Sequence, residues 1–178
     1  WVTFDPYSFF AWFVVPFLVL LVFGKIDFQW FSLKRAQKVD FVIFLGIILI
    51  GALAISLIPL FPSLSSYYES YGERALDFKL LYAKRHLIWL SCWLFPWEFL
   101  TRYVLLKSSV KLNSRWGWLF VPLFELGYHL IKPWPEAVGM LFFSLFLTIW
   151  TMRRKSLMPA FIAHLIIELE LLAFLLLV

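Results

Sequence analysis

An uncharged apolar stretch from Phe41 to Phe61 sets the strongest limit on what this chain can fold into. About 20 apolar residues in a row are enough for a helix to cross a bilayer. Comparable stretches recur along the chain, and we expect each of them to form a spanning helix. The expected helices cover residues 7–23, 41–61, 80–106 (or 86–106), 116–131, 136–152 and 157–178.

The composition indicates that lipid, and not water, is the main solvent of this chain. Hydrophobic residues make up 63% of the 178 residues and charged residues 15%, whereas a soluble domain is about half apolar and about a quarter charged. We therefore predict an all-α fold, a polytopic membrane helix bundle of about six transmembrane helices in a single domain over residues 1–178. The one cysteine, Cys92, excludes an intrachain disulfide and a thiolate metal cluster.

The basic residues divide unequally between the two ends of the expected helices. If successive loops alternate between the two sides, one side carries ten basic residues and the other five, with Arg102 inside a span. Basic loops usually face the cytoplasm, so we expect an integral protein of the bacterial cytoplasmic (inner) membrane with the richer side inside. These loops account for the net charge of +5, so the lipid bilayer is the expected partner and nucleic acid is not. The richer side holds Lys25, Lys34, Arg35, Lys38, Lys107, Lys111, Arg115, Arg153, Arg154 and Lys155.

Two of the connecting segments differ in character. Residues 24–40 mix basic and aromatic side chains, which suits either a segment lying at the membrane interface or an ordinary basic loop. Residues 63–77 are polar, and we expect them to form an exposed aqueous loop.

Charged side chains inside the expected helices are the candidates for function. Glu98 and Arg102 lie four residues apart, so on a helix they share a face and can pair. A charge left in hydrocarbon costs at least about 2.5 kcal/mol, so such residues turn inward, and they often mark a functional site. An ion pair that only stabilises packing explains the same spacing.

Two further helices carry polar residues with the same spacing, Glu125 with His129 and His164 with Glu168. Carboxylates and imidazoles gathered in a low-dielectric pocket can activate water, with a glutamate as general base and histidines positioning water or stabilising an oxyanion. A His/Glu set can also bind zinc. The spacing is not the H-E-x-x-H of zinc proteases, and we predict neither a metal nor another cofactor. Serine hydrolase chemistry is not indicated, because G-x-S-x-G is absent from the sequence.

The order of these motifs resembles the CAAX protease and bacteriocin-processing family (CPBP or Abi), whose members are intramembrane glutamic endopeptidases. The family pattern is E-E-x-x-x-R, then F-x-x-x-H at the end of the next helix, then S-L-x-P-A-x-x-x-H-x-x-x-N after a span with a basic turn. This chain reads W-E-F-L-T-R at 97–102, E-L-G-Y-H at 125–129 and S-L-M-P-A-F-I-A-H-L-I-I-E at 156–168. The resemblance covers about residues 97–172 and implies a CPBP-like core of helices over residues 80–178.

Three positions depart from the family pattern. Trp97 stands where the family has the glutamate that activates water, Glu125 replaces the aromatic residue, and Glu168 replaces the final asparagine. The resemblance implies that Glu98 supports Arg102, and both are retained. Because tryptophan cannot take a proton, either Glu125 or Glu98 has become the base, or the protein no longer cuts peptides.

Two functions are therefore open from the sequence. The first is a divergent CPBP-type intramembrane endopeptidase that hydrolyses a membrane peptide or protein. The second is a non-catalytic membrane scaffold, or an integral subunit of a larger complex with membrane-protein partners. A transporter would need a polar path, and Ser144, Thr148 and Thr151 are too few to indicate one.

The endopeptidase hypothesis gives each candidate a role. His129 assists the base and Arg102 orients Glu98. His164 and Glu168 line the oxyanion side. The candidate catalytic residues are thus Glu98, Arg102, Glu125, His129, His164 and Glu168.

Overall fold

The computed structural model describes residues 5–72 and 74–177, with residues 69–72 described by their backbone. Within these ranges every regular element is helical and no strand occurs. The predicted fold class, an all-α membrane helix bundle, is confirmed. Three of the described helices are long and apolar enough to cross a membrane, namely Lys38–Leu60, Trp134–Arg154 and Met158–Leu177, and Pro6–Val22 is a shorter apolar helix.

The N-terminal helix is apolar and begins at a proline. α1 (Pro6–Phe9) and α2 (Val15–Val22) are joined through the π-helical segment Phe10–Val14 into one continuous helix. Pro6 occupies the first turn, where the missing N–H costs no helical hydrogen bond. The helix agrees with the predicted range 7–23.

Two 3-10 turns lead from this helix into α3. The turns, Phe28–Phe31 and Leu33–Arg35, lie in the segment for which an interfacial position was one of two expectations. α3 (Lys38–Ser56) carries Asp40 in its first turn, and the Asp40 carboxylate accepts a hydrogen bond from the Gln37 backbone N–H at 2.6 Å. A carboxylate suits this position, because the first turn of a helix has unpaired N–H groups.

The polar segment that we expected to be an aqueous loop is mainly helical, so that expectation is wrong. α4 (Pro62–Gly72) covers most of residues 63–77. Pro62 stands at its start, where proline is tolerated. Tyr68 donates a hydrogen bond to Glu136 Oε2 at 3.0 Å. This distant contact stabilises a segment whose own composition gives no strong helix signal.

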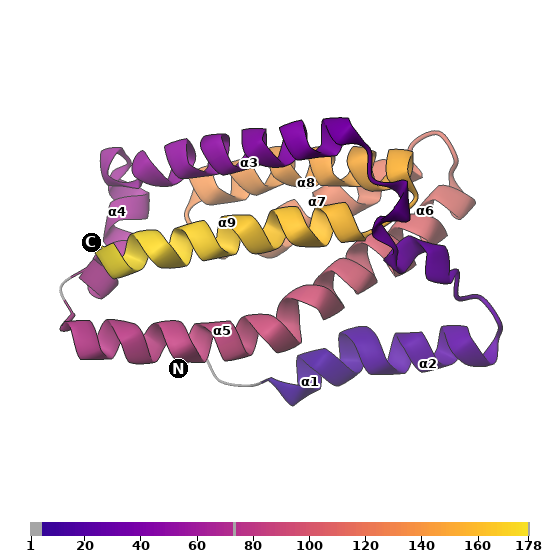
Figure 1. The fold of residues 1–178 in the computed structure, drawn as a ribbon, viewed down its shortest axis with the longest axis horizontal. Coiled ribbons are helices and arrows are strands. Elements are labelled where there is room, and N and C mark those ends of the chain that lie inside the picture. Colours follow the sequence, from indigo (N-terminus) through magenta and orange to yellow (C-terminus); the bar gives the residue numbers. More distant parts are fainter. Residues whose placement is uncertain (1–4, 73, 178) are drawn as a thin grey trace.

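α5 widens its turn near the centre of the bundle. α5 (Leu76–Glu98) continues through the π-helical segment Phe99–Leu105 into α6 (Leu106–Leu112). Pro96 lies inside α5 and lacks the backbone N–H that a regular helix uses. Kinks and π-helical turns arise at such places and are frequent at functional sites. Figure 1 shows the long helix bending from α5 towards α6.

α8 (Trp134–Arg154) and α9 (Met158–Leu177) agree closely with the predicted ranges 136–152 and 157–178. α8 ends at Arg154, and the next residue, Lys155, has a left-handed φ of 47°. That conformation is a common way to end a helix, and the chain turns there into α9.

α7 (Phe120–His129) is shorter than the helix predicted over 116–131. Its 10 residues span about 15 Å at 1.5 Å per residue, about half the thickness of a bilayer core. A 3-10 turn, Gly117–Leu119, takes up the first predicted residues, and Pro133 follows soon after its end. α7 therefore depends on its neighbours, and it packs along α8.

α9 lies between α3 and α5, and α7 and α8 lie behind it (Figure 1). α3 has an outward face on which Leu49, Ile50 and Leu53 are exposed, as expected for a helix that contacts lipid. The connections from α2 to α3, from α6 to α7 and from α8 to α9 lie at one end of the bundle. That end carries the ten basic residues that the sequence grouped together.

Candidate functional site

Arg102 lies at the centre of a buried polar network, on the π-helical segment that follows α5. Its Nε is 3.4 Å from Glu98 Oε2, one turn earlier on the same helix. Its second contact comes from α7, where Glu125 Oε2 accepts a hydrogen bond from a terminal guanidinium nitrogen at 2.7 Å. All three side chains are 0% exposed. The predicted pair of Glu98 and Arg102 therefore forms, and Glu125 makes it a cluster of three charges.

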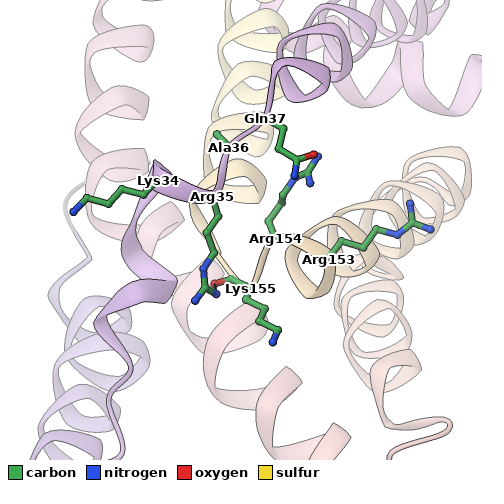
Figure 2. Close-up of a pocket in the computed structure, with 7 residues that line it drawn as sticks. All are labelled: Lys34, Arg35, Ala36, Gln37, Arg153, Arg154 and Lys155. Carbon is green, nitrogen blue, oxygen red and sulfur yellow. Dashed lines mark hydrogen bonds between the residues drawn. The ribbon is translucent and has the colours of Figure 1, made fainter.

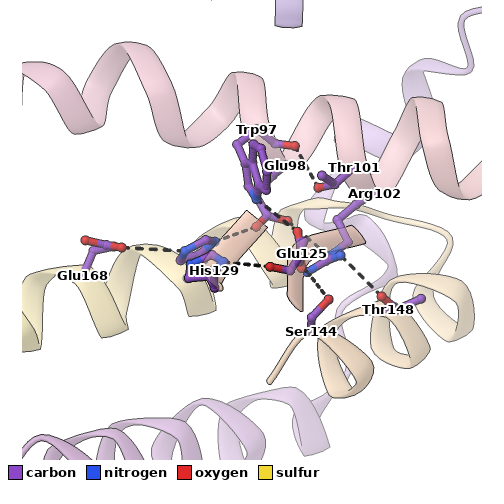
Figure 3. Close-up of polar contacts among 10 residues, drawn as sticks. Trp97, Glu98, Thr101, Arg102, Glu125, His129, Ser144, Thr148 and Glu168 are labelled. Carbon is purple, nitrogen blue, oxygen red and sulfur yellow. Dashed lines mark hydrogen bonds and ion pairs between the residues drawn. The ribbon is translucent and has the colours of Figure 1, made fainter. Parts of the chain in front are cut away.

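α8 contributes two hydroxyl groups to the same guanidinium. Arg102 donates to Ser144 Oγ at 3.3 Å and to Thr148 Oγ1 at 3.4 Å (Figure 3). These two residues are not among the six predicted site residues. They are four residues apart, so the spacing that identified the charged pairs also identifies them as one polar face of a helix.

Both oxygen atoms of the Glu125 carboxylate have hydrogen-bond donors. Oε2 accepts from Arg102, and Oε1 accepts from the indole N–H of Trp97 at 3.0 Å. Trp97 itself is 1% exposed. It stacks on Trp93 with ring centroids 5.5 Å apart and contacts Tyr128 at 4.8 Å. Trp97 and Glu125 are two of the three residues that differ from the family pattern, and their side chains are thus in direct contact.

His129 does not pair with the Glu125 carboxylate, although the spacing predicted that pair. Its Nδ1 lies 2.9 Å from the backbone carbonyl oxygen of Glu125. A carbonyl only accepts, so Nδ1 carries the proton, and Nε2 is the acceptor when the ring is neutral. The carboxylate turns away from His129 because Arg102 and Trp97 hold it.

His164 on α9 connects the network to a fourth helix. Its Nδ1 is 2.7 Å from Glu98 Oε1, and its Nε2 is 3.8 Å from Glu168 Oε1. The closer partner of His164 is therefore Glu98 on α5, and the predicted partner Glu168 is the more distant one. Glu168 in turn has Oε2 3.4 Å from Nε2 of His86, near the middle of α5.

A second polar cluster closes the other end of the bundle, away from the basic loops. Lys132, in the connection between α7 and α8, pairs with Glu136, which also accepts the Tyr68 hydroxyl. Burial is the largest single effect and lowers the pKa of Lys132, but the charge and hydrogen bond of Glu136, together with Glu168 and Tyr67, bring that pKa above its ordinary value. Burial and the same carboxylate raise the pKa of the Tyr68 hydroxyl far above its ordinary range. Both groups therefore keep their protons at neutral pH.

The structure joins five of the six predicted site residues through their side chains, and the sixth, His129, contacts only the backbone carbonyl of Glu125. Together α5, the π-helical segment, α7, α8 and α9 build this network. The catalytic roles assigned to these residues stay predictions. In the described part of the chain, no three His, Cys, Asp or Glu side chains are grouped so that they hold a metal ion. The predicted site residues are Glu98, Arg102, Glu125, His129, His164 and Glu168, and Ser144, Thr148, Trp97 and His86 are the additional members.

Comparison with known proteins gives one family match. Residues 83–169 match the family described as Type II CAAX prenyl endopeptidase Rce1-like. This range runs from α5 to α9 and contains all six predicted site residues. No curated protein and no solved structure matches the chain significantly. The resemblance to CAAX proteases predicted from the motifs is confirmed over this segment.

Proposed function

We propose that this chain is a non-catalytic relative of the CAAX prenyl endopeptidases, whose family model matches residues 83–169, and that it serves as a membrane scaffold or complex subunit. The observation that carries this proposal is the buried hydrogen bond between Trp97 and Glu125. The residue at the position of the family's base is a tryptophan, and its N–H is bonded to Glu125 Oε1 at 3.0 Å.

A general base needs a carboxylate that can reach water and take its proton. Glu125 is 0% exposed and both of its oxygen atoms have donors, one of them the Arg102 guanidinium at 2.7 Å. Charge-assisted hydrogen bonds of this kind are about twice as strong as neutral ones and favour the ionised acceptor. Glu98 is equally buried, with Oε1 2.7 Å from His164 Nδ1, while its Oε2 makes an ion pair with Arg102 Nε at 3.4 Å and no hydrogen bond. These contacts suit charge balance better than proton abstraction.

A structural role for the network follows from the physics of helix association in lipid. Lipid tails are as apolar as the helix surfaces, so helices associate through close packing and polar contacts. Arg102 alone contacts side chains of three other stretches, Glu98 on α5, Glu125 on α7, and Ser144 on α8. Retaining these charges without cutting peptides is therefore consistent with a scaffold.

A second candidate, a peptidase with a relocated base, has one observation in its favour. Relative to the family pattern, this chain has the acid and the aromatic exchanged between positions 97 and 125, and the structure brings those two side chains into contact. The exchange keeps a carboxylate near Arg102, but that carboxylate lies on α7 and not on α5. In this alternative Glu125 is the base, and His129, one turn away, assists it.

Peptide cleavage tests the proposal. The purified protein is incubated in bilayers with a prenylated peptide ending in C-A-A-X, beside an active member of the family as a control for the substrate. We expect no product from the wild type. The double variant Trp97→Glu/Glu125→Phe restores the family's acid and aromatic, and it is expected to cleave the peptide. Wild-type cleavage as fast as that of the double variant would contradict the proposal.

A further inference from the structure

A basic cleft of about 460 Å³ lies at the end of the bundle where α3 begins and α8 ends, well away from the buried network. The volume falls within the roughly 300–1,000 Å³ that is typical of small-molecule sites. Figure 2 shows the side chains of Arg35 and Lys155 lying together, with Lys34 and Arg153 extending to either side. The residues lining this basic cleft are Lys34, Arg35, Ala36, Gln37, Arg153, Arg154 and Lys155.

Hydrogen bonds fix the two walls of the basic cleft relative to each other. Arg35 donates to the backbone carbonyl of Lys155 at 3.2 Å. Beside it, the Ser156 hydroxyl donates to the Ser32 carbonyl at 2.8 Å, and the Leu157 backbone N–H donates to the Trp30 carbonyl at 2.9 Å. The loop before α3 and the turn after α8 are thus tied together, so the cleft is formed before any ligand arrives.

The positive charge of the basic cleft is largely unbalanced. Arg154 is neutralised by Asp40, whose Oδ1 accepts from Arg154 Nε at 2.9 Å and from a terminal nitrogen at 2.8 Å. The other four basic side chains of the lining have no carboxylate contact among the described residues. Like charges held together repel, and their summed potential attracts anions.

The position of the basic cleft indicates which anion it meets. α3 and α8 belong to two of the helices that are long and apolar enough to span a membrane. Their ends therefore lie at the depth of the lipid headgroups, and basic pockets between spanning helices are suited to phosphate-bearing headgroups. Guanidinium groups such as those of Arg35 and Arg153 match phosphate oxygens in geometry as well as in charge.

We propose that the basic cleft binds the phosphate group of an anionic lipid headgroup. Its ligand is held by Lys34, Arg35, Arg153 and Lys155, while Arg154 keeps its contact with Asp40. Free phosphate has the same chemistry, and the experiment separates the two sources.

The test is a titration of the full chain in an uncharged detergent. Short-chain phosphatidylglycerol, short-chain phosphatidylcholine and inorganic phosphate are added in separate calorimetric titrations. We expect saturable binding of phosphatidylglycerol at one site, with phosphatidylcholine and inorganic phosphate at least about tenfold weaker, a difference of about 1.4 kcal/mol. If inorganic phosphate binds as tightly as phosphatidylglycerol, the lipid assignment is overturned and a soluble phosphate compound is the ligand.

Two variants that each lose three positive charges distinguish binding in the basic cleft from an effect of the net charge. Lys34→Gln/Arg153→Gln/Lys155→Gln changes exposed side chains of the cleft, and we expect it to weaken phosphatidylglycerol binding at least about tenfold, because charge-assisted hydrogen bonds are lost. The control, Lys25→Gln/Lys111→Gln/Arg115→Gln, removes the same charge from the same end, and its affinity stays within about twofold because distant exposed charges are screened. Unchanged circular dichroism melting shows that both variants fold. Equal weakening in both, or no saturable binding by the wild type, would overturn the proposal.

Discussion

Arg102 holds together the buried charges at the centre of the bundle. Its guanidinium contacts Glu98 and Glu125 at 3.4 and 2.7 Å, and none of the three side chains is exposed. A guanidinium suits this position because its fork of donors is rigid and stays charged. Without it, two carboxylates would face each other in a region of low dielectric constant, where breaking a buried pair is costly.

Arg102→Met is therefore expected to lower the free energy of unfolding by about 3–5 kcal/mol, since it leaves buried carboxylates unpaired. Ser144→Ala removes one neutral acceptor of the same guanidinium, and we expect a loss of only about 0.5–1.5 kcal/mol. Unfolding in mixed micelles with rising dodecyl sulfate measures both. Equal stability of Arg102→Met and wild type would show that the charge cluster contributes nothing to the fold.

At this scale the sequence predicted the residues of the site better than their contacts. Spacing along one helix identified the pair of Glu98 and Arg102, because both members share a face. It could not show that Glu125 reaches Arg102 and not His129, since spacing within a helix carries no information about the neighbouring helix. Ser144 and Thr148 are too few for a transport path, and the sequence alone does not show that they are hydrogen-bond acceptors of Arg102.

The helices fall into two groups, those specified by their own sequence and those stabilised mainly by tertiary contacts. α3, α8 and α9 were predicted with nearly correct bounds, because length and apolarity alone are enough to specify a spanning helix. α4 and α7 were not, and both are short, so their stability comes from tertiary contacts more than from their own sequence. The π-helical segment after α5 also escaped prediction, although Pro96 gives a local reason for it.

The contact that attaches α4 to the bundle can be tested through one hydroxyl group. Tyr68→Phe removes the hydrogen bond to Glu136 and keeps the ring, so we expect the free energy of unfolding to fall by about 0.5–1.5 kcal/mol. Tyr67→Phe is the matched control, because Tyr67 is its exposed neighbour on the same helix and should show no change. The same micellar unfolding measurement serves for both, and an equal effect of the two substitutions would exclude the Tyr68 contact as the attachment of α4.

The molecule as a whole has an apolar girdle and two polar ends of different character. One end holds the ten basic residues and the basic cleft, and the other holds the cluster around Glu136. This asymmetry was predicted from loop charges alone, since the alternation of spans fixes which loops share a side. Which side of a membrane each end faces is a prediction from the same rule.

Cysteine labelling tests that orientation in a bacterial inner membrane. The native Cys92 is buried, so it gives little background. Ser114→Cys lies at the basic end, and we expect an impermeant maleimide to label it only after the membrane is opened. Ser66→Cys lies on α4 at the opposite end and should react in intact spheroplasts. Labelling of Ser114→Cys but not of Ser66→Cys in intact spheroplasts would show the reverse orientation.

The central claim is that the buried carboxylates balance charge and do not activate water. The rate of cleavage of a prenylated C-A-A-X peptide in bilayers, compared between wild type and Glu125→Gln, tests it most directly. We predict that both rates equal that of protein-free vesicles. A wild-type rate above that background which Glu125→Gln lowers by about 10²-fold or more, as expected for loss of a general base, would contradict the claim and establish Glu125 as that base.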